Sequence, residues 1–398
     1  MFLRRFFGSF ISKIIMPAQR LYPAAPHDPA NQSYSDSISS HLKLIKSSGN
    51  AQIGVRQFCS TDKLKITPDT KVILHAFGNA DCVENHQFEL QETSLSYKET
   101  IVTSMNFRNV GKSQGSVSSE KDWVDDAVAV INHYRSLGIP LKNILLNGHS
   151  LGGAILTMAA STIYKEELAT LQKSKKTITD NDKNECSPRL INNRSFSTLA
   201  DEIMVSILHG LGTGLLTGII YGLLATLFVT TSTAWIIGGA LLASGLIYPQ
   251  IPEFFFRPIL NTVLWLSFGR MDAFSAYQAL PNEAKDYIIA KDDGVICERA
   301  TIHYRLKSQR KTQKKELKKE ISNTSDENEK VSLHARLLNI KDCKLRFAAD
   351  NSISVEAHNC PMNYLKTFHK LRDGTTPNNH QTSGDIVMNN KCRKLLKI

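Results

Sequence analysis

The residue best suited to nucleophilic chemistry is a serine between glycines. A short apolar run at 144–146 leads into Gly-His-Ser-Leu-Gly at 148–152, and small residues at helical spacing follow. Strand, sharp turn and helix with a serine at the turn make up the nucleophile-elbow pattern G-x-S-x-G. Such a turn holds Ser150 in a strained backbone conformation, and side chains at Gly148 or Gly152 would collide with the neighbouring strand and helix.

A serine hydroxyl needs a base to accept its proton and an acid to orient that base. In chains with this elbow the order is serine, acid, histidine. An apolar run at 287–289 leads into Asp292 and Asp293, where the acid is expected. We favour Asp293 and keep Asp292 as the alternative. Two loop aspartates that cap the next helix are the competing interpretation.

The histidine is expected after the acid. His303 follows the acid too closely, on a predicted helix. His358 follows a weakly strand-like run at 353–355 and precedes a predicted helix at 362–371. Because strand, loop and helix in that order suit a catalytic histidine, the sequence predicts His358 as the base.

An acyl-transfer site of this kind also needs two backbone N–H groups for the developing oxyanion. One is expected from Leu151, directly after the nucleophile. The other is expected from the loop that follows an apolar strand at 72–74. Asn79 is the candidate there, since Gly78 permits a close approach.

The elements that must position these residues alternate between strand and helix. A second strand is predicted at 101–105 and an amphipathic helix at 120–137, so an α/β class follows. The polar, proline-containing segment 17–60 is interpreted as a linker. We predict a first core part at 61–165, an insertion at 166–270 and a second core part at 271–398.

The N-terminal segment 1–16 has an apolar face, with Arg5, Ser9 and Ser12 opposite it. One interpretation is an amphipathic helix that lies in a membrane surface. A helix packed on the domain is equally compatible with the pattern.

Within the insertion, residues 203–251 contain no Lys, Arg, Asp or Glu. A segment of this length predicts a membrane-associating helical hairpin, and glycines four apart would let its helices pack closely. A buried hairpin of a soluble domain is the alternative. Lysines and arginines flank both ends, which predicts that both core parts lie on the cytosolic side of the membrane.

A net charge of +11 favours an acidic partner such as an anionic membrane. Basic residues are not interleaved with aromatic ones, which disfavours nucleic acid. The lysine-rich stretch 307–330 is either attracted to anionic lipid or a solvated helix. Seven scattered cysteines without a C-x-x-C spacing disfavour a zinc site and a disulfide framework. No metal or cofactor is expected, and the sequence leaves the oligomeric state open.

Taken together, these motifs resemble the α/β-hydrolase superfamily, over roughly 70–165 and 270–372. The resemblance implies an α/β-hydrolase core, with a mostly parallel sheet flanked by helices and a hydrophobic helical insertion. More narrowly, the chain resembles the SidB/SdbA type of Dot/Icm-secreted effectors, which would place it at a host-cell membrane. The superfamily resemblance rests on Gly78-Asn79-Ala80, Phe107-Arg108-Asn109-Val110-Gly111, Gly148-His149-Ser150-Leu151-Gly152-Gly153, Asp293-Gly294-Val295-Ile296 and His358-Asn359. The narrower resemblance rests on Gly78-Asn79-Ala80-Asp81-Cys82-Val83-Glu84, Asp293-Gly294-Val295-Ile296 and His358-Asn359-Cys360-Pro361-Met362.

Two residues depart from the superfamily pattern. Asn109 stands where an Arg-Gly-x-Gly turn has glycine, and Ala76 stands where His-Gly has glycine. The resemblance implies a serine ester hydrolase. The hydrophobic insertion would hold its pocket near a membrane, so we expect it to act there on a lipid or acylated molecule. The departures motivate an alternative, a non-catalytic membrane scaffold on a hydrolase-like fold. A soluble esterase whose apolar insertion is a lid is a third reading.

Overall fold

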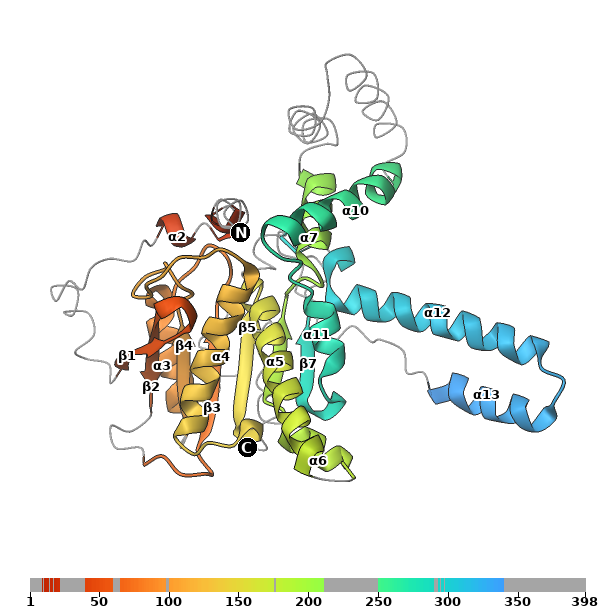
Figure 1. Cartoon of the computed structure of the whole chain (residues 1–398), viewed down its shortest axis with the longest axis horizontal. Coiled ribbons are helices and arrows are strands. Elements are labelled where there is room, and N and C mark those ends of the chain that lie inside the picture. The colour runs from red at the N-terminus through yellow and green to blue at the C-terminus, as the bar shows by residue number, and fades with distance from the viewer. Residues whose placement is uncertain are drawn as a thin grey trace, which may run out of the picture.

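A mixed, mostly parallel sheet forms the centre of the molecule (Figure 1). The computed structural model describes residues 9, 11–13, 15–16, 18–21, 40–59, 65–97, 100–174, 177–210, 250–289, 293, 295–296 and 298–339. Within this part of the chain, seven strands lie in the order β1-β2-β4-β3-β5-β6-β7. Strands β1 and β2 pair antiparallel, as do β2 and β4, and all other neighbours are parallel. The strands are β1 Ser40–Lys46, β2 Gln52–Phe58, β3 Lys71–Ala76, β4 Thr100–Met105, β5 Ile144–His149, β6 Arg189–Asn193 and β7 Lys285–Ile288.

The strands β3, β4 and β5 are almost completely buried. Parallel strands covered on both faces read as continuous apolar runs, which is why these three could be predicted from the sequence. The predicted strands at 72–74, 101–105 and 144–146 are confirmed, each with slightly wider bounds.

Helices α4 (Glu120–Ser136), α5 (Leu151–Ser174) and α11 (Ala273–Ala279) pack next to one another beside the sheet (Figure 1). Helix α4 confirms the helix predicted at 120–137. It begins where the Asp122 carboxylate accepts a hydrogen bond from the Ser119 N–H at 3.0 Å. Its buried face contains Trp123, Val124 and Ile131. Helix α3 (Gln87–Ser96) contacts β2 and β4.

The prediction of a linker over 17–60 is wrong for residues 40–58. Strands β1 and β2 form an antiparallel hairpin there, around the 3-10 turn η2 (Ser48–Asn50). Gly49 and Asn50 both have positive φ in this turn, 64° and 62°. The first core part therefore begins at β1. The predicted linker also contains the short helix α2 (Ala18–Leu21).

The predicted insertion boundary at 166 is also wrong. Helix α5 continues to Ser174, and after the short helix α6 (Asp180–Glu185) the chain returns to the sheet as β6. The chain leaves the sheet only after β6, through α7 (Leu199–Gly210), and comes back through α10 (Gln250–Ser267). Because β6 pairs with β5 and β7, it belongs to the core.

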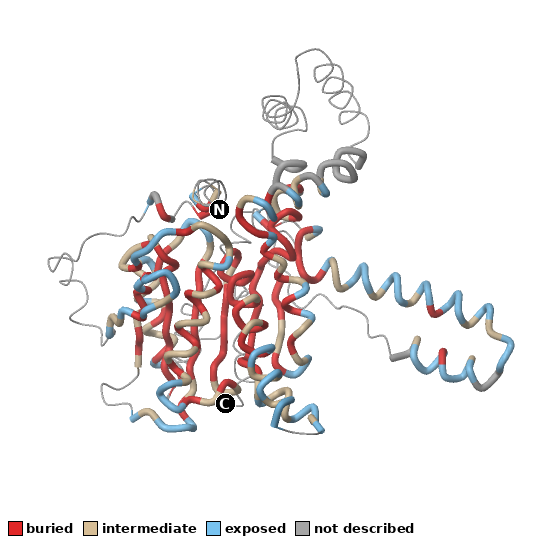
Figure 2. Tube along the Cα trace, viewed as in Figure 1, coloured by how far each residue is buried: buried red, intermediate tan, exposed pale blue. Residues whose placement is uncertain are grey.

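After β7 two long helices, α12 (Ile302–Asn323) and α13 (Glu327–Asn339), form a hairpin that extends away from the sheet (Figure 1). Most of its residues are exposed, while Leu317 and Leu333 are buried (Figure 2). Short 3-10 turns complete the described elements: η3 Val83–His86, η4 Leu141–Asn143, η5 Asn282–Ala284 and η6 Glu298–Ala300.

Near the N-terminus, Met16 is 1% exposed, and Ile11 and Ile15 pack against the core. Of the two interpretations of residues 1–16, the described part favours a helix packed on the domain. Among the helices that the structure describes, none is long and apolar enough to cross a membrane. Most of the predicted hairpin, 211–249, lies outside the described residues.

Candidate active site

Ser150 occupies the sharp turn between β5 and α5. Its φ is +52°, a left-handed conformation that residues other than glycine adopt at a cost of about 1–3 kcal/mol. The turn is fixed from two sides: the Ser150 N–H donates to the Asn193 carbonyl at 3.0 Å, and its carbonyl accepts from the Gly153 N–H at 3.0 Å. The side chain is buried, with 5% of its surface exposed. The strained elbow predicted from the sequence is present.

The glycines of the elbow leave room only for hydrogen. A Cβ at Gly148 would lie 2.5 Å from the Gly152 carbonyl oxygen. A Cβ at Gly152 would lie 2.5 Å from the Phe77 carbonyl oxygen. Because the obstacles are backbone atoms, they cannot move aside, and the two positions require glycine for the reason that the motif suggested.

The loop after β3 lies directly against Ser150. The Gly152 N–H donates to the Phe77 carbonyl at 3.1 Å. A Cβ placed on Gly78 would be 3.8 Å from the Ser150 hydroxyl oxygen. Asn79 follows at the exposed end of this loop. The structure thus brings Ser150 and the loop of the predicted oxyanion donor together.

Leu151 is the first residue of α5, so its N–H has no acceptor within the helix. The positive end of the helix dipole also points toward the turn, which favours negative charge there. An oxyanion beside Ser150 would therefore meet a favourable potential. The assignment of Leu151 and Asn79 as its two donors remains a prediction from the sequence.

The loop after β3 is itself held by a second group of side chains. The Phe77 ring stacks on the His86 imidazole, with centroids 4.0 Å apart and planes inclined by 14°. His86 Nε2 pairs with the Asp81 carboxylate, and Nδ1 lies 2.9 Å from the Glu89 carboxylate. Sequence reasoning did not single out His86, because nothing in the spacing of three polar residues shows that they meet under an aromatic ring.

A second histidine near the site is structural. His75, the residue before Ala76 on β3, has its Nδ1 3.2 Å from the Asn147 amide nitrogen. Burial, with a smaller contribution from the charge of His86, lowers the pKa of His75 to about 3. His75 is therefore neutral at physiological pH.

The loop after β6 connects the elbow to the strand that precedes the predicted acid. Asn193 accepts from the Ser150 N–H, and the Arg194 N–H donates to the Ile288 carbonyl at 2.8 Å. Arg194 also has positive φ, +47°. The sequence does not indicate this loop, since the short polar strand β6 has no apolar periodicity.

Asp293 lies in the loop after β7, at the carboxyl edge of the sheet where the acid was expected. Its Oδ1 accepts from the N–H groups of Val295 and Ile296, at 2.9 and 2.8 Å. These two hydrogen bonds resemble those of the competing interpretation, in which the aspartate caps the segment that follows. Asp292 and His358 lie outside the described residues, so the roles of the three triad candidates stay predictions.

The departures from the superfamily pattern fit the backbone around the site. Asn109 has φ of +65°, a conformation that asparagine adopts more readily than most residues. Ala76 is completely buried at the end of β3. Neither residue disrupts the loops that approach Ser150.

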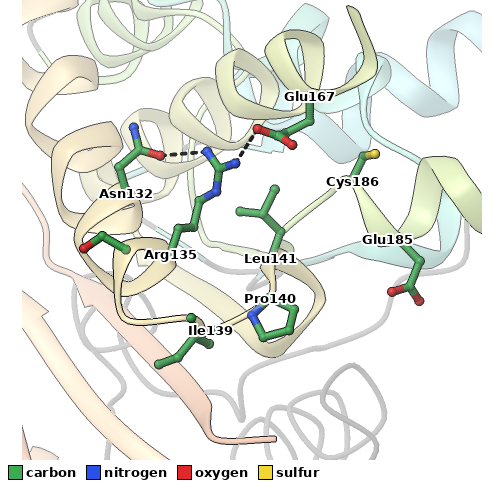
Figure 3. Close-up of a pocket in the computed structure, with 10 residues that line it drawn as sticks. Asn132, Arg135, Ile139, Pro140, Leu141, Glu167, Glu185 and Cys186 are labelled. Carbon is green, nitrogen blue, oxygen red and sulfur yellow. Dashed lines mark hydrogen bonds and ion pairs between the residues drawn. The ribbon is translucent and has the colours of Figure 1, made fainter. Parts of the chain in front are cut away.

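A surface pocket lies at the opposite end of β5 (Figure 3). It is lined by the end of α4, the η4 turn and parts of α5 and α6, and Arg135 pairs there with Glu167 and with the Asn132 side chain. The η4 turn precedes β5, whereas Ser150 follows it. Six residues of strand, about 20 Å, separate the two ends, so this pocket is distinct from the candidate active site.

Among the residues that the structure describes, no group of His, Cys, Asp and Glu side chains could hold a metal ion. This includes the cluster of His86, Asp81 and Glu89, whose carboxylates pair with the imidazole.

The sheet order defines an α/β fold with a mixed, mostly parallel sheet, and Ser150 lies at the sharp turn between β5 and α5. By sequence, the chain matches no protein family and no curated protein. Among solved structures, it is similar to an alpha-beta hydrolase from Vibrio vulnificus, with 13% identity over 92% of this chain and 93% of the other and a TM-score of 0.45. It is also similar to the esterase Pf2001 of Pyrococcus furiosus, with 12% identity over 89% and 93% of the two chains and a TM-score of 0.40. A hyperthermophilic esterase from Pyrobaculum calidifontis shares 15% identity over 49% of this chain and 51% of its own, with a TM-score of 0.27. Similarity at this level leaves the function to be argued from the site itself.

Proposed function

We propose that this protein is a serine ester hydrolase with Ser150 as its nucleophile. The observation that carries the proposal is the elbow: a serine with φ of +52° at the carboxyl end of a buried parallel strand, at the start of a helix and against the loop after β3. A strained serine is maintained only where surrounding structure enforces it, and such residues cluster at functional sites.

In the proposed reaction, the Ser150 hydroxyl oxygen attacks the acyl carbonyl carbon while His358 takes its proton. Asp293, or Asp292 as the alternative, orients the imidazole. Backbone N–H groups of Leu151 and Asn79 stabilise the oxyanion. The ester C–O bond then breaks, His358 returns the proton to the leaving alcohol, and water releases the acid from the acyl-enzyme.

A fluorophosphonate probe tests this assignment, because it phosphonylates activated serines. Wild-type protein is expected to be labelled, and Ser150→Ala is expected to lose the label. Ser195→Ala is the matched control, since Ser195 is also buried and lies beside Gly153. Equal labelling of wild type and Ser150→Ala, or no labelling of wild type, would refute the proposal.

We further propose that the substrate is an acyl ester of a lipid or an acylated molecule, cleaved at a membrane. Helix α7 begins at Leu199, six residues after Asn193, whose carbonyl binds the Ser150 N–H. The uncharged segment 203–251 thus begins on a helix that starts only a few residues after the loop bonded to the elbow. Figure 1 shows α7 and α10 beyond the end of the sheet at which α5 begins.

The basic side of α12 supports the same proposal. Five lysines on this helix are exposed: Lys307, Lys311, Lys315, Lys318 and Lys319. Each would contribute about 1 kcal/mol of attraction near an anionic surface. The core would then face the cytosolic side, and the narrower resemblance to secreted effectors would make that membrane one of a host cell.

Flotation with lipid vesicles tests the location. The full chain is expected to float with vesicles that contain phosphatidylserine, and replacement of the five lysines by glutamine is expected to reduce the floated fraction in low salt. A protein that stays at the bottom of the gradient with every vesicle composition would favour a soluble esterase with a lid.

A further inference from the structure

The loop that approaches Ser150 has no regular structure of its own, so something else must hold it. Between Ala76 and the start of η3 at Val83, the chain makes an exposed turn at 79–80. A backbone hydrogen bond links it to the elbow, since the Phe77 carbonyl accepts from the Gly152 N–H at 3.1 Å. The position of Phe77 therefore sets where the following N–H groups lie relative to Ser150.

The Phe77 ring is fixed by His86. The two rings stack almost parallel, 4.0 Å apart, and Phe77 is 3% exposed. Asp81 and Glu89 hold the imidazole from both sides, through Nε2 and Nδ1. Asp81 is in turn fixed by the Cys82 N–H and the Asn85 amide, each at 2.8 Å.

We propose that His86 is a positioning residue, which holds the oxyanion loop beside Ser150 through its stack on Phe77 and its pairing with Asp81 and Glu89. His86 does not touch the reacting atoms. It would act through Phe77, whose carbonyl and following peptide groups line the space beside the nucleophile. This inference rests on the proposed function. It adds a charged group, called here the clamp, that consists of His86, Asp81 and Glu89 and holds Phe77.

The charge of His86 gives the clamp a pH dependence. Burial alone would lower the pKa of His86, but hydrogen bonds to Asp81 and Glu89 raise it to about 9. Among the described residues, His75 also interacts electrostatically with His86, and burial keeps His75 neutral. A cationic imidazolium binds both carboxylates and stacks more strongly on an aromatic ring.

The raised pKa of His86 determines the pH range in which its ion pairs with Asp81 and Glu89 form. Because the pKa of His86 in the folded protein is above the ordinary value of 6.5, the clamp is fully present below about pH 6.5 and is lost as the pH rises through about 9. Labelling of Ser150 should therefore depend on His86 at neutral pH and lose that dependence at high pH.

Fluorophosphonate labelling rates between pH 7 and 10.5 test the inference. His86→Phe, which keeps an aromatic stack but removes both ion pairs, is expected to label about 10-fold more slowly at pH 7.5, less than the 10²–10³-fold loss for removal of an oxyanion donor. The ratio of wild-type to variant rates should approach one above pH 9. Glu89→Gln should move the midpoint of this decline to lower pH. His41→Gln, on the exposed edge of β1, is the control and should match wild type.

Amide hydrogen exchange tests the same inference without catalysis. Residues 77–80 and Gly152 are expected to exchange faster in His86→Phe than in wild type, while the amides of α4 stay unchanged. A rate ratio that is constant from pH 7 to 10.5, or unchanged exchange at 77–80, would overturn the role of His86. If wild type is not labelled at all, the proposed function fails, and the exchange measurement alone decides whether His86 holds the loop.

Discussion

At the scale of single residues, Ser150 is held in place by its neighbours. Its N–H donates a hydrogen bond to the Asn193 carbonyl, and its carbonyl accepts one from the Gly153 N–H. The neighbouring Gly152 N–H donates a hydrogen bond to the Phe77 carbonyl. These contacts offset the cost of the left-handed conformation, about 1–3 kcal/mol. The Ser150 side chain, the proposed nucleophile, is therefore positioned before any substrate binds.

A methyl group at position 152 tests this packing. In Gly152→Ala the new Cβ would meet the carbonyls of Ala76 and Phe77, so we expect unfolding to become easier by about 1–3 kcal/mol and labelling of Ser150 to be lost. Gly78→Ala is the control for stability, because its Cβ would lie at an ordinary 3.4 Å from the Ser150 side chain. Urea denaturation of both variants measures the difference, and equal stability of the two would contradict this account.

At the scale of elements, one buried ion pair connects three parts of the fold. Arg108, just after β4, binds the Asp126 carboxylate of α4, with Nη2 2.5 Å from Oδ1. Ser47, at the β1–β2 turn, donates to the same carboxylate at 2.8 Å. Arg108 is 3% exposed and Asp126 is completely buried, so neither group can exchange its partner for water.

Replacement of one member of this ion pair should lower the free energy of unfolding substantially. We expect Arg108→Met to lower the free energy of unfolding by about 3–5 kcal/mol, because a buried carboxylate loses its cation. Lys121→Met removes the exposed pair with Asp125 on the same helix and should cost about 0–1 kcal/mol. Urea titration of the two variants compares them, and a similar small effect for both would show that the buried pair is not needed.

The elements that could be predicted from the sequence are those whose apolar pattern is decided locally. Strands β3, β4 and β5 and helix α4 belong to this group. Strand β6 could not be found, because Asn192 is a polar residue that its tertiary partners satisfy: its amide donates to the Gly153 carbonyl at 3.1 Å and to the Thr157 hydroxyl at 3.0 Å. The β1–β2 hairpin did leave a signal, since Ser-Gly-Asn separates two alternating runs, but the proline-rich segment before it favoured a linker.

The residues of the candidate site also fall into a group that a local pattern predicts and a group that it does not. The elbow is a local motif, so Ser150 and its glycines could be predicted. The clamp of His86 and the loop after β6 depend on residues that only the folded chain brings together, and no spacing in the sequence indicates them.

At the scale of the whole molecule, Asp201 connects the elements around the uncharged segment. This carboxylate on α7 is 1% exposed and pairs with Arg257 of α10 and, at 2.6 Å, with Arg305 of α12. It also accepts from the Ser197 hydroxyl at 2.6 Å. One carboxylate thus connects α7 and α10, the helices on either side of residues 211–249, with the start of α12.

Removal of this charge should loosen all three helices together. We expect Asp201→Asn to lower stability by about 1.5–3 kcal/mol, the range for hydrogen bonds to charged groups, since both arginines are partly exposed. Limited proteolysis should also cut α10 more rapidly. Asp180→Asn, at a position that is 92% exposed, is the control. Unchanged proteolysis of Asp201→Asn would contradict a connecting role.

If Ser150 is the proposed nucleophile, it should accept an acyl group from an ester. The most direct test is to mix the full chain with a p-nitrophenyl acyl ester, quench within a turnover, and map the added acyl mass by peptide mass spectrometry. We expect an acyl group on Ser150 in wild type, none in Ser150→Ala, and slow formation in His358→Ala. No acyl adduct in wild type, or an adduct on another residue that persists in Ser150→Ala, would contradict it.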